Sequence, residues 1–440
     1  MKQSVVFILL ICALSSCKQE PYIELEAISD ADHFHKSVKN LSDIIVHDIF
    51  SPPVASRVYI YPIIAAYETL IQAHPEYKSL AGQLNGLTPS PQADSTKQIS
   101  FPTAALHAFN IIGQELTFSV QRYDEHMQAV SDQLKELGLP KHVNEASKAY
   151  GEEVAAHILA WASKDNYHQT RTFPKFSITQ EEARWKPTPP GYGEGIEPHW
   201  NKIRPFVIDS ADQFKPLPPT EFSTSKNSQF YKEAMEVYEV VNEADEEEKA
   251  IASFWDCNPY ALNITGHVMH ATKKITPGGH WIGIVGVASR KADADLMKSI
   301  EAYTMTAIAL ADGFISCWDE KYRSNLTRPE TVINEHYDES WVPILQTPPF
   351  PEHTSGHSVI SRAAAIALTS VYGDNFAYED DVELEYGLPI RSYRSFLHAS
   401  EEAAISRLYG GIHFRPAIDE GVKQGEEVGK LIVDRVKLKS

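Results

Sequence analysis

The segment "PPFPEHTSGHS", residues 348–358, places a hydroxyl, a glycine and an imidazole directly before a helical pattern. Ser355 is a good helix N-cap, and the Gly356 N–H stands where helix N-termini bind phosphate-like anions. His357 can give or take a proton near neutral pH. The segment therefore predicts either an anion-binding loop or an ordinary helix cap beside a surface histidine.

A second segment, "WDEKYRSNLTRPE", holds two cations, Lys321 and Arg328, at a separation close to two helical turns. On one helix they would share a face and reach a single point. Pro329 should end that helix close to Arg328. The alternative interpretation is a solvated basic face, so the pair needs support from elsewhere in the chain.

A third segment, "AAISRLYGGIHFRP", provides that support, because Arg407 and His413 flank the pair Gly410-Gly411. A bend at the glycines would bring both side chains to the same place. A further cation, a further histidine and two glycines have no evident packing purpose. The three segments together favour the anion site over the separate structural interpretations.

The elements that must position these residues are helical in pattern. Apolar residues recur at three- and four-residue spacing in several ranges, while alternating strand patterns are few. These ranges are 55–73, 101–116, 143–165, 228–255, 292–322 and 357–373. The Pro- and Gly-rich insert 184–206 predicts a long, ordered surface excursion. The pattern predicts a large all-α protein without internal repeats.

The three segments match a known signature. K-x6-R-P, S-G-H and S-R-x5-H occur as Lys321…Arg328-Pro329, Ser355-Gly356-His357 and Ser406-Arg407…His413. This order resembles the type-2 phosphatidic acid phosphatase (PAP2) and vanadium-dependent haloperoxidase superfamily. Looser matches over most of the chain, among them "ADGFISCWDEKY" and "PPVASRVYIYPIIAAYE", are similar to its soluble haloperoxidase branch. The resemblance implies an all-α helical-bundle domain with signature segments in residues 321–419.

The resemblance also implies a role for each matched residue. The oxygens of a tetrahedral oxyanion, vanadate or phosphate, would be held by five groups: Lys321, Arg328, Ser355, the Gly356 N–H and Arg407. His413 would bind vanadium or attack phosphorus, and His357 would be the general acid or base. Phe350 stands where the subclasses differ and is a halide-pocket candidate. Its aromatic ring resembles the chloroperoxidase pattern, and the alternative is a core phenylalanine.

Two positions depart from the family pattern. Thr354 replaces the proline that usually precedes S-G-H, so the loop should be slightly less rigid. The family often has an aspartate four residues after the last histidine, where this chain has Ala417, and the nearest acid is Asp419. In phosphatases such an aspartate orients the nucleophilic histidine. Its displacement argues against nucleophilic phosphatase chemistry.

The first hypothesis is accordingly a vanadate-dependent haloperoxidase that uses hydrogen peroxide to oxidise a halide. The alternative is an exported acid phosphatase that hydrolyses a soluble phosphate ester through a phosphohistidine, without a cofactor. A third possibility is an oxyanion-binding protein without turnover, against which the intact His357 argues. The halide, the organic acceptor and the oligomeric state stay open.

The N-terminus resembles a bacterial lipoprotein signal. Lys2 precedes an apolar run over residues 5–14, and "LSSC" then places small residues before Cys17. The resemblance implies a signal peptide, a lipidated cysteine that anchors the exported protein in a membrane, and a periplasmic or cell-surface location. Ordinary secretory cleavage near Ser16 is the alternative.

The chain should accordingly divide into three parts. They are a signal peptide over residues 1–16, a tether over residues 17–35 and a single domain over residues 36–440. With 43% hydrophobic and 22% charged residues, the chain has globular composition.

The net charge of −19 argues against nucleic acid and anionic membrane surfaces as partners, so membrane contact should be through the lipid anchor only. The body contains two cysteines, Cys257 and Cys317, whose pairing stays open and whose spacing does not indicate a metal site. His267 and His270 form an H-x-x-H pair, which is weak evidence for a metal without other ligands.

Overall fold

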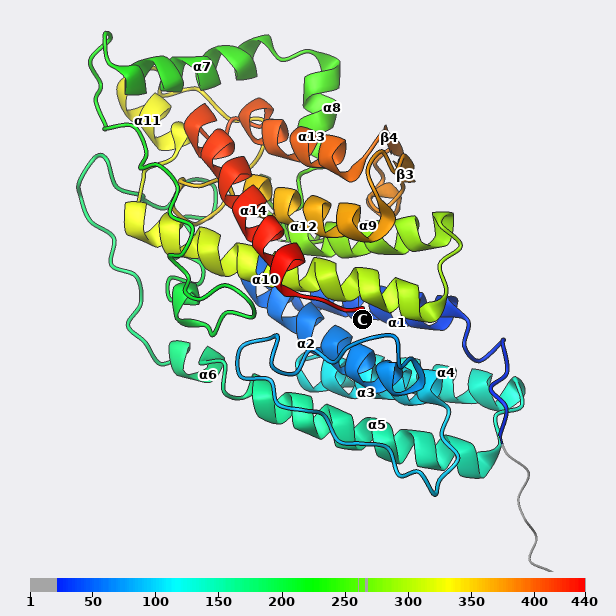
Figure 1. The fold of residues 1–440 in the computed structure, drawn as a ribbon. Coiled ribbons are helices and arrows are strands. Elements are labelled where there is room, and N and C mark those ends of the chain that lie inside the picture. Colours follow the sequence, from blue (N-terminus) through cyan, green and yellow to red (C-terminus); the bar gives the residue numbers. More distant parts are fainter. Residues whose placement is uncertain (1–21, 260, 266–267, 440) are drawn as a thin grey trace, which may run out of the picture.

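The computed structural model describes residues 22–259, 261–265 and 268–439 (Figure 1). The predicted signal peptide, Cys17 and His267 lie outside these described residues. Helices dominate the fold, as the apolar spacing predicts, and strands form only short ribbons within the described part. Among the helices described, none combines the length and the apolar character that crossing a membrane requires.

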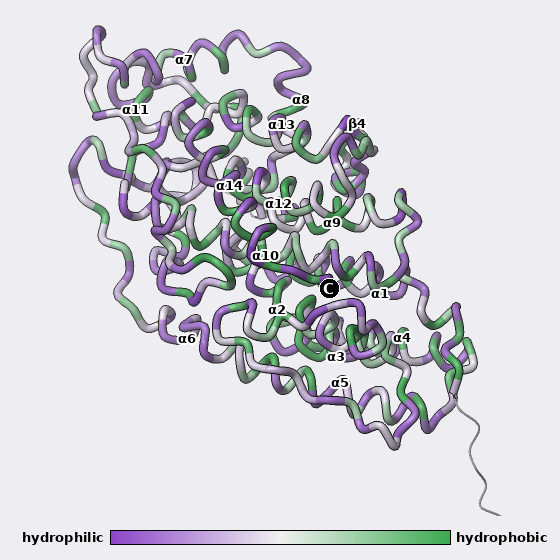
Figure 2. Tube along the Cα trace, in the orientation of Figure 1, coloured by the Kyte–Doolittle hydropathy of each residue, from purple (hydrophilic) through white to green (hydrophobic). Residues whose placement is uncertain are grey.

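The first half of the chain forms one group of helices around α2. Its members are α1 (Ala31–Asp48), α2 (Pro52–Leu70), α3 (Phe101–Glu115), α4 (Val120–Glu136), α5 (Lys141–Ala162) and α6 (Tyr167–Thr170), with the 3-10 turns η1 (Ile71–Ala73) and η2 (Trp200–Lys202). Every residue of α2 is buried, because this helix packs against α3 and α5 on its own side and against α10 of the second half. In Figure 2 the tube is accordingly hydrophobic along much of α2 and α3.

The second half surrounds α12. Its helices are α7 (Gln229–Glu243), α8 (Glu246–Phe254), α9 (Pro277–Lys291), α10 (Leu296–Ser324), α11 (Pro329–His336), α12 (Gly356–Tyr372), α13 (Phe396–Tyr409) and α14 (Arg415–Arg435). The helix α12 packs against α9, α10, α13 and α14. Two antiparallel ribbons and a 3-10 turn complete it: β1 (Ala261–Thr265) with β2 (Val268–Thr272), β3 (Tyr378–Asp380) with β4 (Arg391–Tyr393), and η3 (Leu384–Tyr386).

One continuous cluster of buried side chains joins the two halves, extending from Phe34 to Leu438. Its first member lies on α1, which begins at Ala31 inside the segment predicted to be a tether. Asp30 caps this helix by accepting a hydrogen bond from the Asp32 N–H. The polar composition of the leader concealed an amphipathic first turn, whose apolar face is buried.

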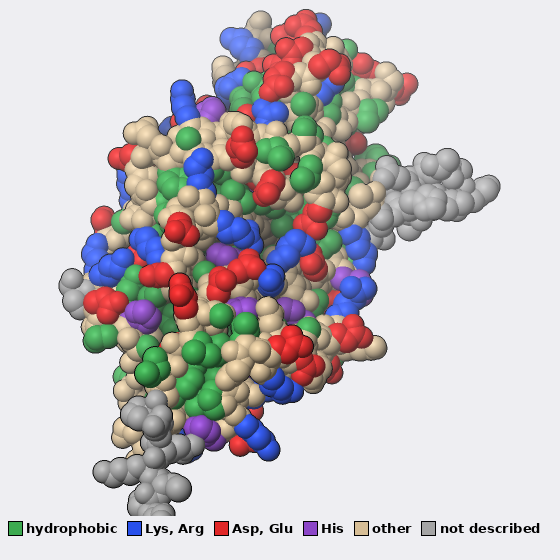
Figure 3. All heavy atoms as spheres, turned by 90° about the vertical axis from the view of Figure 1, so that its right-hand side faces the viewer, with side chains coloured by type: hydrophobic (Ala, Val, Ile, Leu, Met, Phe, Trp, Pro, Cys, Tyr) green, Lys and Arg blue, Asp and Glu red, His purple; other side chains and the backbone are tan. Residues whose placement is uncertain are grey.

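The helical pattern over residues 228–255 forms two helices instead of one. Asp245 begins α8 through a capping box, in which its carboxylate accepts from the Glu248 N–H while the Glu248 carboxylate accepts from the Asp245 N–H. Glu246 and Glu247 are exposed and form a solvated acidic face. Figure 3 shows acidic groups gathered at the end of the molecule where Figure 1 places α7 and α8.

The insert 184–206 is irregular except for η2, as its prolines and glycines predict, but it is more than a surface excursion. Trp185 and Trp200 are fully buried. The Ile196 carbonyl accepts hydrogen bonds from Trp318 Nε1 (3.1 Å) and Tyr322 Oη (2.6 Å), both at the end of α10. The Ile196 N–H donates to the Pro349 carbonyl at 3.0 Å. The insert therefore connects α10 to the loop before α12.

Candidate active site

The three segments singled out in the sequence meet around the N-terminus of α12. The end of α10 approaches from one side and the α13–α14 connection from another, because α10, α13 and α14 all pack along α12. Lys321, Arg328, Ser355, Arg407 and His413 are all buried, with 2% or less of their surface exposed. Such burial excludes the interpretation of Lys321 and Arg328 as a solvated basic face.

Lys321 and Arg328 do not lie on one helix, so that prediction is wrong. The helix α10 ends at Ser324, and Asn325 takes a left-handed conformation with φ 47°. Pro329 occupies the first turn of α11, which Arg328 precedes as its N-cap residue. Proline fits that position because its missing N–H has no partner in a first turn. Both cations still reach the same loop, because the chain turns between them.

Lys321 uses its ammonium group to hold the loop before α12. Nζ donates to the carbonyl oxygens of Pro351 (3.1 Å), Glu352 (3.0 Å) and Thr354. Burial lowers the pKa of Lys321 to about 7, a shift that nearby Arg328 reinforces and nearby Glu352 opposes. The predicted oxyanion ligand is thus placed behind the loop and supplies it with positive charge.

Arg328 joins the loop to the last element of the signature, the segment that carries His413. Its Nε donates to the Phe350 carbonyl at 2.9 Å, and Nη1 donates to the Ile412 carbonyl at 2.8 Å. Burial lowers the pKa of this guanidinium to about 10, so it stays charged at neutral pH. The buried Nη2 has no hydrogen-bond partner among the described residues. A donor of this kind is suited to an anion oxygen.

Ser355 is the N-cap of α12, and both interpretations of the sequence apply to it. Its Oγ accepts a hydrogen bond from the Ser358 N–H at 3.3 Å, and its own N–H donates to the Ala417 carbonyl at 2.9 Å. Gly356 follows at the first helical position and lines the adjoining cavity. A Cβ at Gly356 would come no closer than 3.6 Å to Trp318, so packing alone does not require glycine. A ligand that approached this backbone closely would require it.

Arg407 and His413 come together as the glycine pair predicts. The helix α13 ends at Tyr409, and Gly411 turns the chain with φ 76°. A Cβ there would lie 2.7 Å from Val241, so both conformation and space require glycine. Arg407 Nη2 donates to the Trp255 carbonyl at 2.7 Å, and burial lowers its pKa to about 10.

Glu352, which sequence reasoning missed, orients His413. Its Oε1 accepts from His413 Nδ1 at 2.8 Å and from the Phe414 N–H at 2.9 Å. Arg328 Nη1 faces the other ring nitrogen, Nε2, at 3.1 Å. Burial raises the pKa of Glu352 to about 7, against the effect of Arg328 and Lys321. Its place directly before "HTSGH" was the available signal.

Glu352 therefore supplies the carboxylate that appeared to be displaced. The residues considered for that role do not reach it, since Asp419 is exposed and Ala417 contributes only its carbonyl. Burial, followed by the charges of Arg328, Lys321 and Arg407, holds the pKa of His413 well below its usual value. Nδ1 donates its hydrogen to the carboxylate, and Nε2 is left without a hydrogen. The lone pair of Nε2 accepts from Arg328 Nη1, a hydrogen bond that a ligand bound to Nε2 would replace.

His357 stands on the first turn of α12, and its Nε2 is a buried atom without a hydrogen-bond partner among the described residues. Burial and the charge of Arg407 hold its pKa well below the usual range. The imidazole is therefore neutral at neutral pH and can accept a proton. The backbone at Trp255 provides a hydrogen-bond partner for this half-buried side chain, but Nε2 stays unsatisfied, so the alternative of a histidine fully satisfied by neighbours does not fit.

A cavity of about 340 Å³ opens beside these residues. Gly356, His357, Arg407 and His413 line its polar end. Phe350 lines it too, packed on Trp318 with ring centroids 5.0 Å apart and with the Lys321 ammonium 5.0 Å from its ring. It also belongs to the hydrophobic core, so both interpretations of Phe350 describe its position. Apolar side chains and the polar groups of Arg407, His357 and His413 therefore line the same cavity.

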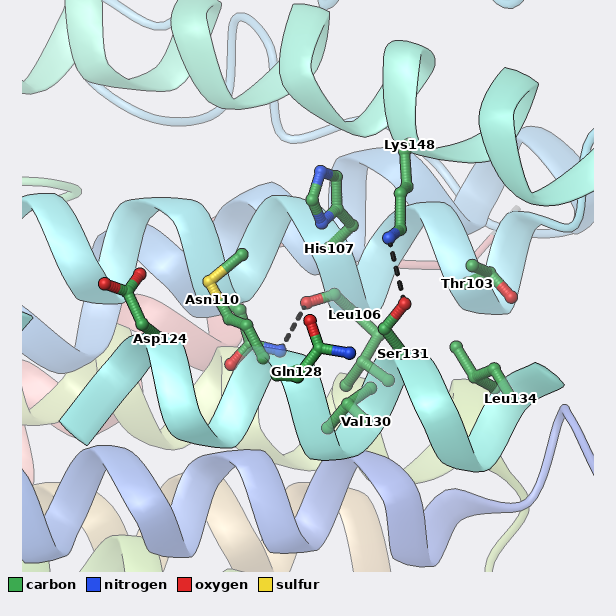
Figure 4. Close-up of a pocket in the computed structure, with 11 residues that line it drawn as sticks. Thr103, Leu106, His107, Asn110, Asp124, Gln128, Val130, Ser131, Leu134 and Lys148 are labelled. Carbon is green, nitrogen blue, oxygen red and sulfur yellow. Dashed lines mark hydrogen bonds between the residues drawn. The ribbon is translucent and has the colours of Figure 1, made fainter. Parts of the chain in front are cut away.

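A second hollow, of about 310 Å³, lies between α3, α4 and α5, which contribute no residue to the first cavity. Figure 4 shows two hydrogen bonds among the residues that line it. Lys148 Nζ donates to Ser131 Oγ at 3.1 Å, and Asn110 Nδ2 donates to the Leu106 carbonyl at 2.9 Å. It collects none of the signature residues, so the chemistry belongs to the cavity at α12.

Comparison with known proteins agrees with this geometry. A family model described as the VCPO second helical-bundle domain matches residues 301–439. The crystal structure of a bacterial vanadium-dependent iodoperoxidase is 52% identical, with a TM-score of 0.90, and the match covers 96% of this chain and 99% of the other. The chain belongs to the vanadium-dependent haloperoxidases. None of the curated proteins compared matches it.

More distant haloperoxidases share the fold. A holo-type bacterial vanadium-dependent chloroperoxidase is 17% identical, with a TM-score of 0.69 over 94% of this chain and 98% of the other. The apo-type chloroperoxidase is 16% identical, with a TM-score of 0.65 over 88% and 94%. The predicted all-α haloperoxidase fold is confirmed. The 52% identity to the iodoperoxidase likewise confirms the haloperoxidase function, with vanadate as the cofactor and hydrogen peroxide and a halide as substrates.

The residues of this haloperoxidase fit vanadate. The buried Arg328 Nη2 and His357 Nε2 both lack partners among the described residues, and both are atoms that can bond to an oxyanion or to a hydroxyl on it. His413 offers a lone pair on Nε2, and the first turn of α12 offers backbone N–H groups. Bound vanadate supplies the activation of hydrogen peroxide toward a halide.

Proposed function

We propose that this haloperoxidase oxidises iodide, with His413 as the vanadium ligand and His357 as the group that moves protons. The observation that carries the role of His413 is its hydrogen bond to Glu352, which leaves Nε2 unprotonated in the cavity. The 52% identity to an iodoperoxidase over nearly the whole chain supports iodide as the halide.

The remaining site residues divide between holding the anion and shaping the loop. Arg328 and Arg407 offset the charge of an oxyanion, and planar guanidinium groups also fix its orientation. Ser355 and the Gly356 N–H add donors at the positive end of α12. Lys321 acts from behind the loop, because its hydrogens are used on loop carbonyls. With a pKa of about 7, it adds positive charge in its protonated form.

The cavity also explains how a halide can be received in an acidic protein. Its walls include apolar side chains, namely Pro52, Phe314, Trp318, Pro349 and Phe350. When it enters such surroundings, a large, weakly hydrated anion loses less hydration free energy than a small one. Arg407 and His357 lie at the same cavity and keep it from being purely apolar. We assign Phe350 to the wall that the halide meets.

The test uses protein purified without phosphate and assayed for peroxide-dependent oxidation of iodide, bromide and chloride, before and after orthovanadate is added. Iodide oxidation should appear only with vanadate. His413→Ala should abolish it, and His357→Ala should lower turnover while vanadate still binds. Loss of vanadate binding in a folded His357→Ala protein would contradict the assigned role. Equal oxidation of bromide and iodide would contradict iodide preference.

Glu352 also supports a second activity, phosphate-ester hydrolysis by the protein without vanadate. The carboxylate places His413 Nδ1–H as the displaced aspartate would have done, so the argument against a phosphohistidine no longer stands. His357 could protonate the leaving oxygen. Hydrolysis of a soluble aryl phosphate that stops when vanadate is added would support this activity, and no hydrolysis above the His413→Ala background would exclude it.

For the N-terminus we propose a lipidated Cys17 and anchorage in a bacterial membrane, with the catalytic body in the periplasm or at the cell surface. The sequence "LSSC" after the apolar run supports this. The full chain expressed in a bacterium should fractionate with membranes. The Cys17→Ser variant should not carry lipid, and lipid on that variant would contradict the assignment.

A further inference from the structure

A cluster of three buried side chains lies behind one wall of the cavity and is not explained by haloperoxidase chemistry. Cys257 follows α8, His280 lies on α9, and Glu383 directly precedes η3. All three are 2% exposed or less. Cys257 also lines the cavity at α12, so the cluster adjoins the vanadate site without belonging to it. These are residue types that bind borderline-soft divalent metals.

The distances within the cluster are those of metal ligands. Cys257 Sγ lies 3.5 Å from His280 Nδ1 and 3.8 Å from Glu383 Oε1, and His280 Nδ1 lies 3.2 Å from Glu383 Oε1. Tetrahedral zinc bonds of about 2.0 to 2.3 Å would separate such ligand atoms by about 3.3 to 3.6 Å. The three atoms are therefore placed around one point.

The surroundings of His280 fit a metal ligand as well. Its other nitrogen, Nε2, lies 2.9 Å from Asp380 Oδ2. Histidines that bind metals usually donate their second N–H to a carboxylate in this way, which directs the lone pair of the first nitrogen toward the metal. The ring is also stacked on Trp255, with centroids 4.7 Å apart and planes 19° apart. Its orientation is fixed from two directions.

Hydrogen bonding leaves part of the cluster unsatisfied. Burial disfavours charge on His280, but Asp380 and Cys257 raise its pKa well above the usual value, so the ring without a metal carries a hydrogen on each nitrogen. The single hydrogen on Nδ1 then lies between Cys257 Sγ and Glu383 Oε1 and can be donated at full strength to only one of them. Glu383 Oε2 is buried and has no hydrogen-bond partner among the described residues. A divalent cation would satisfy the thiolate, the imidazole and the carboxylate together.

We propose that Cys257, His280 and Glu383 bind a zinc ion, oriented by Asp380. The described residues offer three protein ligands, so the fourth position falls to Glu383 Oε2 or to water. The ion would connect three segments far apart in the sequence. It would also fix the turn at Trp255, whose carbonyl accepts the hydrogen bond from Arg407. The site would thus be structural and would support one cation of the vanadate site.

The experiment measures metal on the full mature chain, with vanadate left out of every step. Protein equilibrated with zinc and then desalted should hold one zinc per chain. Cobalt in its place should give the thiolate charge-transfer band and the strong visible bands of a tetrahedral site. Cys257→Ser should lose both signals, whereas Cys317→Ser, the matched change at the other buried free cysteine, should keep them.

Asp380→Asn tests the orientation of His280, because it leaves all three ligands in place. The variant should bind zinc about 10- to 100-fold more weakly than the parent. A chelator should lower the melting temperature of the parent and of Cys317→Ser but leave that of Cys257→Ser unchanged. Zinc content no higher in the parent than in Cys257→Ser would overturn the proposal and leave the cluster as a buried ion pair. A cobalt spectrum without the thiolate band would also overturn it.

Discussion

At the scale of single residues, the site is controlled by which atom holds each hydrogen. Glu352 Oε1 accepts from both His413 Nδ1 and the Phe414 N–H, so one carboxylate oxygen fixes the ring and the backbone beside it. His413 can then present only Nε2 to the cavity. The nearby Arg328 stays protonated and cannot compete for a metal. The ring is thus prepared for a bond before any ligand arrives.

Replacing Glu352 tests this control. Glu352→Ala leaves His413 Nδ1 and the Phe414 N–H without their acceptor, and we expect vanadate to bind about 10- to 100-fold more weakly. Glu352→Gln keeps an oxygen acceptor but removes the charge, so its loss should be smaller. The measurement is the vanadate concentration that restores half of the iodide oxidation. Equal, unchanged affinities in both variants would show that Glu352 does not orient His413.

The site residues that belong to the signature could be predicted from the sequence, while the only signal for Glu352 was its place directly before "HTSGH", which does not name His413 as its partner. Spacing rules find residues whose partners lie on the same turn or loop. Glu352 meets His413 only because the α13–α14 connection folds back onto the loop before α12, a contact between residues far apart in the chain. The same applies to the cluster of Cys257, His280 and Glu383.

At the scale of elements, the N-terminus of α12 combines a helix cap with the proposed anion site. Its first turn carries N–H groups without partners inside the helix, as every helix does, and the axis adds a positive partial charge at that end. Ser355 satisfies one N–H, that of Ser358. Gly356 and His357 then lie at the cavity. The serine that caps the helix therefore directly precedes two residues that line the cavity.

A pair of capping variants separates these two roles. Ser355→Ala and Ser395→Ala each remove a serine that caps a helix, α12 and α13 respectively. Each should lower the free energy of unfolding by about 1 kcal/mol. Only Ser355→Ala should also weaken vanadate binding. Urea unfolding gives the first quantity and vanadate titration the second. Equal vanadate affinity in the two variants would reduce Ser355 to a cap.

Element existence was more predictable than element ends. The six helical ranges found by periodicity all contain helices, because apolar spacing records burial. The break at Asp245 was missed, because a continuous apolar face conceals a capping box. The single helix expected from Lys321 to Arg328 was wrong for a related reason. Asn325 ends α10 in a left-handed turn, which cannot be recognised from the spacing between the two cations.

At the scale of the whole molecule, an acidic protein with a net charge of −19 holds cations at its centre. Burying Lys321, Arg328 and Arg407 costs free energy, visible in the lowered pKa of each group. The continuous core that joins both groups of helices must offset that cost. The first helix contributes through Phe34 and His35, which the sequence placed in a tether.

His35 makes the contribution of α1 measurable through pH. Burial lowers its pKa to about 4 from 6.5, reinforced by Arg290 and opposed by Asp32 and Asp30, and its Nδ1 lies 2.9 Å from the Tyr303 hydroxyl. Between these two values the unfolded chain binds more protons than the folded chain. Stability from this group is therefore complete above pH 6.5 and is lost as the pH falls toward 4.

The shift corresponds to about 3 kcal/mol between the two ends of this range. We expect His35→Gln to remove that part of the pH dependence. As the pH is lowered, the free energy of unfolding should therefore fall less steeply in the variant than in the parent. Urea-unfolding curves at several pH values between 6.5 and 4 give both slopes. Parallel curves would show that His35 is not buried in its neutral form. Because His35 lies in the predicted tether, parallel curves would also mean that this measurement finds no contribution of the tether to stability.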